Sequence, residues 1–321
     1  SWPLVLLWHT VFILMTVFVV ARGVRAGLEK AVTYLMPLLL ALLLVLVGYS
    51  MAEGDFARGF SFLFSPDFKK VFYTCSVEGG IESCAFNGEP LLTAMGHAFF
   101  TLSLGMGAIM VYGSYMPKRT SITGSALLIV FMDTLVALLA GLAIFPLVFG
   151  NNLEPGAGPG LIFQTLPIAF GAMTGGQLFG TLFFVLLVFA AWTSSISLVE
   201  PAVAWLVENR GIRRRHAAAW IGFGCWLLGL GTVFSFNLMS GEQYHIAGKT
   251  VFDLLDFITT NILLPVGGLA MALFTGWFAS RRMSESELGL PDPWFSIWWF
   301  VVRFITPVGV LIIFLHAIGV L

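Results

Sequence analysis

The sequence predicts an all-α polytopic membrane protein, and three observations support this fold class. Of the 321 residues, 58% are hydrophobic and only 10% are charged, a composition too apolar for a soluble globular domain. A membrane-spanning helix needs roughly 20 mostly apolar residues, and eight segments of the chain reach this length. The cations are concentrated in alternate loops between these segments, which is typical of a defined membrane topology.

Eight membrane-spanning helices are therefore expected, in order along the chain. The eight segments are Trp2–Val20, Ala31–Tyr49, Leu92–Tyr115, Ser121–Phe149, Leu178–Val207, Ala217–Phe236, Val251–Phe278 and Trp294–Leu321. The first segment does not resemble a cleavable signal peptide, because Ser1 leads directly into apolar residues without a charged leader. The missing start methionine indicates a processed or truncated chain.

The loop cations predict the orientation, because Lys and Arg accumulate in cytoplasmic loops. One set of alternate loops holds eleven cations, the opposite set holds four, and Arg303 lies inside the last span. The eleven are Arg22, Arg25, Lys30, Lys118, Arg119, Arg210, Arg213, Arg214, Arg215, Arg281 and Arg282. The four are Arg58, Lys69, Lys70 and Lys249. Both ends of an eight-span chain then lie outside a plasma membrane (the bacterial inner membrane), and a protein that starts in the cytoplasm would need an odd number of further N-terminal spans.

The chain is expected to form one transmembrane domain over residues 1–321, because it has no long polar linker and no low-complexity tract. A net charge of −1 with short basic clusters gives no reason to expect nucleic acid as a partner. Cys225 within a helix is expected to be a small buried residue. Cys75 and Cys84 share an outside loop, where Gly79 and Gly80 permit a turn; a disulfide and two free thiols are equal alternatives.

The loop from Gly150 to about Gly176 contains GAGPGLIFQTLPIAF, which is too short and too interrupted by proline to span the membrane. Such a segment is typical of a re-entrant or capping hairpin over an outer vestibule. An ordinary surface loop is the alternative.

The third span carries glycine and hydroxyl residues at its midpoint, in the run Ser103-Leu104-Gly105-Met106-Gly107. Each glycine weakens a helix by about 1 kcal/mol relative to alanine. A helix unwound there would expose carbonyl oxygens and a half-helix N-terminus, which can bind a cation and a carboxylate. Close helix packing is an equal alternative for such small residues.

The fifth span contains FAAWTSSISLVEP, in which Ala190, Thr193 and Ser194 share one helical face. Their carbonyl and hydroxyl oxygens are hard, neutral ligands that suit a small alkali cation. The alternative is that the hydroxyls only bond back to the preceding turn of the helix.

Asp133 lies in the fourth span after seven apolar residues, and an acid inside the membrane indicates a functional site by default. His97 in the third span is its nearest titratable neighbour in sequence, although a lone histidine is more often a packing residue than a proton relay.

Other polar residues lie near the ends of the spans. Asp253 and Asp256 open the seventh span; helix capping explains Asp253 better than Asp256. Tyr115 and Glu208 close the third and fifth spans at the cytoplasmic side, where they can pair as an inner gate.

Taken together, these motifs resemble the neurotransmitter:sodium symporter family, which includes the bacterial leucine transporter. HAFFTLSLGMGAIMVYGSY is similar to the sixth helix of the family, FAAWTSSISLVEP to the eighth, DTLVALLAGLAIFP to the seventh, and RGVRAGLEKAVTYLMP to the entry of the fifth. FSFLFSPDF, TLPIAF and DLLDF match further landmarks in order. The resemblance covers nearly the whole chain. It implies a leucine-transporter-type inverted-repeat bundle represented by family helices four to eleven, with the first three absent.

The resemblance also implies roles for individual residues. One sodium site would use Thr101 and Asp133, and the second would use the Ala190 carbonyl with Thr193 and Ser194. The substrate would contact Phe100, Thr101, Ser103, Met106, Ser194 and Leu198. Asp256 would be the acid of the outer gate, and Tyr115 with Glu208 would form the inner gate.

Two departures from the family pattern bear on coupling and on substrate. His97, Asp133 and Ala137 stand where many members have Gln, Asn and Ser around a chloride. A fixed carboxylate at Asp133 replaces a mobile anion, so sodium is the expected ion and chloride is not expected to be required. Met106 replaces a frequent aromatic residue, which softens the pocket.

These features predict a sodium-coupled symporter of amino acids or small amines that works by alternating access. The alternative is a truncated, non-transporting member that acts as a membrane scaffold. An intramembrane protease is disfavoured, because Asp133 has no second membrane-buried aspartate and Ser194 has no histidine close in sequence. The expected partners are a small-molecule substrate, expected to be an amino acid, and the lipid bilayer.

Overall fold

The computed structural model describes residues 2–23, 27, 29–78, 81–117, 119–156 and 158–320. Several residues named above lie outside this described part, namely Ser1, Arg25, Gly79, Gly80, Lys118 and Leu321. The described chain is almost entirely helical, with one two-stranded hairpin.

Seven helical segments in the described part are long and apolar enough to cross a membrane. They are α1 (Trp2–Ala21), α2 (Lys30–Glu53), α7 (Ile122–Gly150), α10 (Gly176–Arg210), α11 (Arg214–Ser235), and the composite segments Val251–Phe278 and Trp294–Ala317. All seven correspond to expected spans, with ends that differ by up to four residues. The prediction of a polytopic helical chain is confirmed.

The eighth expected span, Leu92–Tyr115, is not a continuous helix. It consists of α5 (Glu89–Thr101) and α6 (Ala108–Tyr115), which are separated by six non-helical residues. Each piece alone is too short to cross a bilayer. The break lies at the glycine-containing run that the sequence singled out.

The two composite segments contain π-helical turns that the sequence pattern did not predict. The first consists of α12 (Val251–Asp256), η4 (Phe257–Leu263), α13 (Leu264–Leu273) and η5 (Phe274–Phe278). The second consists of α15 (Trp294–Phe300), η6 (Val301–Ile305) and α16 (Thr306–Ala317). The turns η4 and η6 each end two residues before a proline, Pro265 and Pro307. Proline cannot donate to the carbonyl four residues earlier, so the wider turn is a local adjustment to that missing bond.

The contacts divide the chain into two compact units. Unit 1 comprises Ser1–Gly23, Lys69–Ile129 and Ile196–Leu321, and unit 2 comprises Val24–Phe68 and Val130–Ser195. The expectation of one transporter domain stays a prediction.

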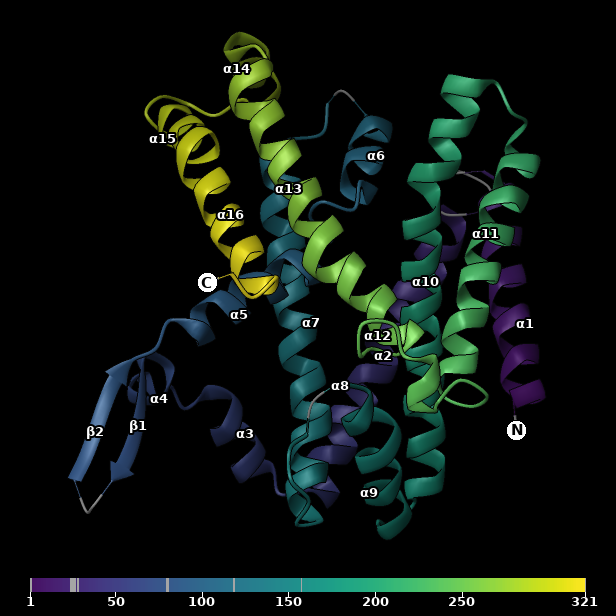
Figure 1. Cartoon of the computed structure of the whole chain (residues 1–321), viewed down its shortest axis with the longest axis vertical. Helices are drawn as coiled ribbons and strands as arrows, with labels where there is room; N and C mark the ends of the chain where they lie inside the picture. Colours follow the sequence, from purple (N-terminus) through teal and green to yellow (C-terminus); the bar gives the residue numbers. More distant parts are fainter. Residues whose placement is uncertain are drawn as a thin grey trace. The chain divides into compact units, whose positions relative to one another are not determined.

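In unit 1, α1 and α11 lie side by side (Figure 1). Glycines make this packing close, because a Cβ on Gly222 would lie 2.1 Å from a methyl group of Val17, and one on Gly229 would lie 2.3 Å from the ring of His9. Trp226 donates to the Thr10 hydroxyl over 3.0 Å in the same seam. Cys225 is exposed on α11, so the expectation of a buried residue was wrong; the neighbouring Trp226 takes the packing position.

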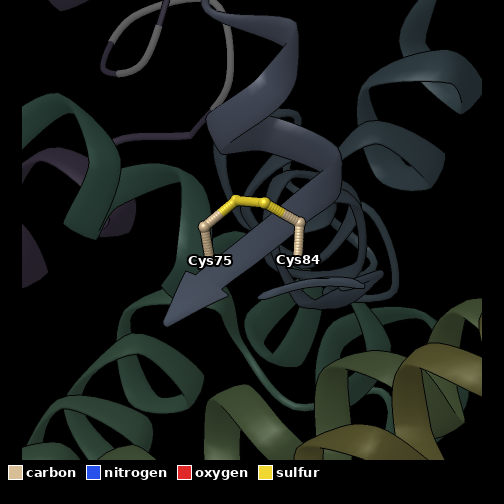
Figure 2. Close-up of a disulfide and its surroundings, with 2 residues drawn as sticks. All are labelled: Cys75 and Cys84. Carbon is tan, nitrogen blue, oxygen red and sulfur yellow. A yellow bond between two sulfur atoms is a disulfide. The ribbon is translucent and has the colours of Figure 1, made fainter. Parts of the chain in front are cut away.

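The hairpin in unit 1 is formed by β1 (Tyr73–Glu78) and β2 (Ile81–Phe86), after the short helix α4 (Phe68–Phe72). Cys75 lies directly opposite Cys84 in the antiparallel register, and the two form a disulfide (Figure 2). Of the two alternatives for these cysteines, the structure has the disulfide.

Unit 2 has its core between α2, α7, α9 (Leu166–Ala172) and α10. The cluster contains Leu43, Leu46, Tyr49, Ala143, Leu147, Val148, Leu166, Phe170 and Phe183. The Tyr49 hydroxyl donates to the Thr174 carbonyl over 3.0 Å, and the Ser50 hydroxyl donates to the Leu142 carbonyl over 2.9 Å. These bonds satisfy polar groups that would otherwise be costly in an apolar interior.

The remaining short elements of unit 2 are α3 (Phe56–Phe64), α8 (Gly158–Gly160) and η2 (Leu161–Thr165). The segment between Gly150 and Gly176 contains α8, η2 and α9, and its expected role as a capping hairpin over an outer vestibule stays a prediction. In unit 1, η3 (Glu242–Tyr244) precedes α12, and α14 (Arg281–Leu288) follows η5.

Candidate functional site

The break between α5 and α6 has a defined backbone geometry. The Leu104 amide donates to the Phe99 carbonyl over 3.0 Å, and the Ser103 amide donates to the Phe100 carbonyl over 3.1 Å. This pair of bonds is a Schellman motif, which ends a helix with one residue in the left-handed conformation. Ser103 occupies that position with φ 54°, where glycine is usual.

Two glycines complete the unwound run. Gly105 and Gly107 both have φ 82°, a left-handed conformation that is strained for other residues. After Gly107 the half-helix α6 starts at Ala108, so its first amides point back into the unwound run. Carbonyl oxygens and helix N-terminal amides therefore occur together, which is the arrangement that can bind a cation and an anion.

The unwound run packs directly on the backbone of α13. A Cβ on Gly105 would lie 2.3 Å from the Leu264 carbonyl oxygen, and one on Gly267 would lie 2.3 Å from the Gly105 carbonyl oxygen. A Cβ on Gly268 would lie 2.5 Å from the ring of Phe99. The two alternatives for the small residues, an unwound helix and close helix packing, therefore occur together. The glycines permit the unwound backbone and also let it pack tightly on α13.

Four of the expected substrate residues lie in this run or at the end of α5, and Leu198 lies on α10. Thr101, Ser103 and Met106 are partly buried, whereas Phe100 is exposed at the end of α5. Leu198 is exposed on α10. Their role as a substrate pocket stays a prediction.

The hydroxyl face of α10 in unit 2 has the oxygen atoms that the motif predicted. The Thr193 hydroxyl is 3.0 Å from the Ala190 carbonyl oxygen and 3.0 Å from the Phe189 carbonyl oxygen, to which it donates. Thr193 is buried, and Ser194 beside it is exposed. Bonding back to the preceding turn therefore does occur, as the alternative proposed. It also brings the Thr193 and Ala190 oxygens together.

Thr101 and Asp133 belong to unit 1 and unit 2 respectively. Asp133 is partly buried on α7. The sodium site that they are expected to share stays a prediction, and so does the participation of Ser194 on the substrate side.

At the start of the seventh span, Thr250 is the N-cap of α12. Its hydroxyl accepts from the Asp253 amide over 3.1 Å and lies 2.7 Å from the Asp253 carboxylate. Capping therefore accounts for Asp253, as expected. Asp256 is exposed one turn further on, where its carboxylate accepts from the Thr260 hydroxyl over 3.3 Å.

Two hydrogen bonds join α6 to α10, and their residues are three positions apart on each helix. The Tyr112 hydroxyl donates to the Ser197 hydroxyl over 2.6 Å, and the Tyr115 hydroxyl donates to the Glu200 carboxylate over 3.1 Å. The expected partner of Tyr115 was Glu208, which is exposed. Glu208 lies eight residues beyond Glu200, or about 12 Å further along the helix. The bond between Tyr112 and Ser197 fixes how α6 lies along α10, and this places Glu200 opposite Tyr115.

The Glu200 carboxylate is also ion-paired with the Arg214 guanidinium. Arg214 in turn donates through Nε to the Val20 carbonyl over 2.8 Å, near the end of α1, and the same carbonyl accepts from the Gly23 amide over 3.1 Å. Tyr115, Glu200, Arg214 and Val20 thus form one network in unit 1, called here the inner network.

The sequence interpretation did not assign roles to Glu200 and Arg214 in this network. A usable signal existed, because Glu200 precedes Pro201 inside an apolar span and the rule that singled out Asp133 applies to it as well. The sequence analysis uses Arg214 only as one of the loop cations that predict the membrane orientation.

Comparisons with known proteins agree with this geometry. The model of the sodium:neurotransmitter symporter family matches residues 1–321. The chain is 37% identical over 319 residues to YhdH of Bacillus subtilis (strain 168), described as an uncharacterized sodium-dependent transporter, covering 97% of this chain and 66% of YhdH. It is 32% identical to an uncharacterized sodium-dependent transporter of Haemophilus influenzae, covering 98% of this chain and 65% of the relative.

A similar solved structure is the crystal structure of MhsT in complex with L-phenylalanine. It superimposes with a TM-score of 0.83 at 39% identity and covers 97% of this chain and 68% of MhsT. The chain thus spans about two thirds of the length of these relatives.

Proposed function

The chain belongs to the sodium:neurotransmitter symporter family, and from this premise we propose that it is part of a sodium-coupled amino-acid symporter that works by alternating access. It is a membrane transporter component and not an enzyme. Its spans correspond in this proposal to family helices four to eleven of an inverted-repeat bundle, within one transporter domain whose two chain ends lie outside.

The observation that carries the proposal is the break between α5 and α6. A helix interrupted between Thr101 and Ala108 presents backbone carbonyls and the first amides of α6 inside an apolar segment. In lipid, non-helical backbone is tolerated only where it is buried in protein or lines a cavity. We propose that this run, besides packing on α13, lines the substrate cavity. The carboxylate of an amino acid would bind the α6 N-terminus, and its side chain would contact Phe100, Ser103 and Met106.

Sodium would bind at two sites. The first would use Thr101 and Asp133 beside the substrate. The second would use the Ala190 carbonyl with the Thr193 and Ser194 hydroxyls, and the short separation of the Thr193 and Ala190 oxygens supports it. Neutral hard oxygens favour Na⁺ over softer transition metals.

Chloride would not be required, because the Asp133 carboxylate supplies a fixed negative charge beside the first sodium site. A chloride requirement for uptake would contradict this part of the proposal.

Alternating access needs a barrier on each side of the substrate. Asp256 would close the outer side, and Tyr115 with the acids of α10 would close the inner side. The partners of these gates would come from parts of the relatives that this chain does not span.

A second candidate is a non-transporting scaffold. The chain spans about two thirds of its relatives, and a partial bundle lacks part of the expected binding site. Ligand binding separates the two functions, because a scaffold needs no sodium site.

The test is binding of labelled L-amino acids to the purified product of the open reading frame that contains this sequence. Sodium is titrated at constant ionic strength with K⁺ as the replacement ion. A symporter binds ligand only as sodium rises, whereas a scaffold binds none in either salt. L-phenylalanine is a suitable first probe, since MhsT was crystallised with it.

A further inference from the structure

Arg303 lies inside the last membrane-spanning segment, Trp294–Ala317. Within the part of the chain that the structure describes, no carboxylate is paired with it, and its Nε is buried without a hydrogen-bond acceptor. A cation within a membrane span is costly unless it is paired. Arg303 therefore needs an anion that the described residues do not supply.

The position of Arg303 is fixed by its neighbours. Its guanidinium lies 4.3 Å from the centre of the Trp277 ring, and the Trp277 indole donates to the Arg303 carbonyl over 3.1 Å. That carbonyl cannot receive a bond from the residue four positions later, because that residue is Pro307. A Cβ on Gly276 would lie 2.8 Å from the Arg303 Cα, so only glycine permits this approach.

The Nε–H group of Arg303 is enclosed, and no hydrogen-bond acceptor is recorded in the described part of the chain for the two terminal nitrogens of the guanidinium. A guanidinium has five donors in a planar fork, which matches the geometry of a phosphate. The Phe304 ring, 5.6 Å away, is a second aromatic neighbour. Aromatic rings hold the cation but do not neutralise its charge.

The guanidinium lies beside the end of the neighbouring span, although Arg303 itself is the tenth residue of Trp294–Ala317. Trp277, on which it rests, is the second-last residue of the span Val251–Phe278. Helical side chains point toward the N-terminus of their helix, so Arg303 points toward Trp298 and Trp299. Tryptophans of this kind mark the membrane boundary, where lipid headgroups begin.

The surroundings of Arg303 are open and apolar. Trp277 and Phe304 are 53% and 45% exposed, and Phe278 at the end of the span is 80% exposed. Arg281, which follows the neighbouring span, donates to the Ser296 hydroxyl, and this hydroxyl donates to Asp292. Of these two arginines, Arg303 is the one whose guanidinium has no recorded hydrogen-bond acceptor in the described part of the chain.

We propose that Arg303 and Trp277 form a binding site for the phosphate of an anionic phospholipid. The phosphate accepts from the guanidinium, and the acyl chains lie along the exposed Trp277 and Phe304 rings. A lipid fits better than a free phosphate ion, because the open face is apolar and lies at the membrane boundary. The loop cations predict that this boundary is cytoplasmic, where anionic lipids add to the attraction.

The test compares the protein, expressed from the open reading frame that contains this sequence, in nanodiscs of phosphatidylcholine and of phosphatidylcholine with phosphatidylglycerol. Native mass spectrometry counts retained lipids, and thermal unfolding gives the shift in Tm. We expect retained phosphatidylglycerol and a higher Tm for the wild type. Arg303→Gln should weaken lipid retention by about tenfold, the effect of one charge-assisted hydrogen bond, and Arg303→Lys should retain part of it.

The matched control is Arg282→Gln, which removes an exposed cation on the same side of the chain and should leave the lipid preference unchanged. Equal retention by Arg303→Gln and the wild type would overturn the proposal, as would a wild type without preference for phosphatidylglycerol. A Tm shift produced by inorganic phosphate alone in neutral detergent would assign the site to a free anion and overturn the lipid assignment.

A second readout does not depend on folding of the Arg303 variants. Brominated phosphatidylglycerol should quench the fluorescence of Trp277 more than brominated phosphatidylcholine does, with the Trp277 signal taken as the difference between wild type and Trp277→Phe. Equal quenching by the two lipids would contradict the site.

Discussion

The Glu200 carboxylate is completely buried and is ion-paired with Arg214, which follows it by fourteen residues across the turn between α10 and α11. Tyr115 donates to the same carboxylate from α6, and Arg214 reaches the end of α1. Four helices of unit 1 therefore meet at one charge pair. A buried pair of this kind is costly to break from one side, because it leaves a buried charge unpaired.

The first prediction concerns this pair. Arg214→Ala should destabilise the protein by about 3–5 kcal/mol, because it leaves Glu200 buried without its cation. Thermal unfolding in a mild detergent measures the loss. Glu208→Gln is the control, since it neutralises an exposed acid on the same helix and should change Tm little. An unchanged Tm for Arg214→Ala would refute the role of the inner network.

A second prediction tests the unwound run. Gly105→Ala should abolish ligand binding and lower stability, because the left-handed backbone alone costs roughly 1–2 kcal/mol and the new Cβ meets the Leu264 carbonyl. Gly113→Ala on α6 is the matched control, because a Cβ there meets nothing within 4 Å. Wild-type binding by Gly105→Ala would show that the run tolerates a side chain and that the geometry is not needed.

The third prediction concerns the cysteines. Without reductant, only Cys225 should react with a maleimide, because Cys75 and Cys84 are joined. After reduction, all three cysteines should react. Mass spectrometry of the labelled, denatured protein gives the count, and three labels without reductant would contradict the disulfide.

The sequence predicted the membrane-spanning helices well because each of them corresponds to a long run of apolar residues. Seven spans are set by apolar runs of roughly 20 residues or more, the length that a membrane-spanning helix needs. The break in the eighth was also readable, since glycine and hydroxyl residues at a span midpoint weaken the helix locally. The π-helical turns before Pro265 and Pro307 were not predicted, because periodicity does not distinguish one extra residue per turn from a regular helix.

The sequence indicated which residues belong to the candidate site better than it indicated which residues they contact. Thr193 and Ala190 share a face because of their spacing of three residues. The sequence associated Tyr115 with Glu208, whereas the structure bonds it to Glu200, since a helix position alone does not fix the register between two helices. Glu200 and Arg214 form a contact between segments that the sequence had treated as separate, one apolar span and one basic loop.

The most direct measurement is uptake of L-phenylalanine and a panel of other amino acids into proteoliposomes containing the product of the open reading frame that includes this chain. An inward sodium gradient should drive uptake, and an equal potassium gradient should not. Thr193→Ala should lower the apparent sodium affinity by about tenfold through the loss of one ligand oxygen, while Thr181→Ala, an exposed hydroxyl on the same helix, should not. Equal uptake under sodium and potassium gradients would contradict sodium-coupled symport.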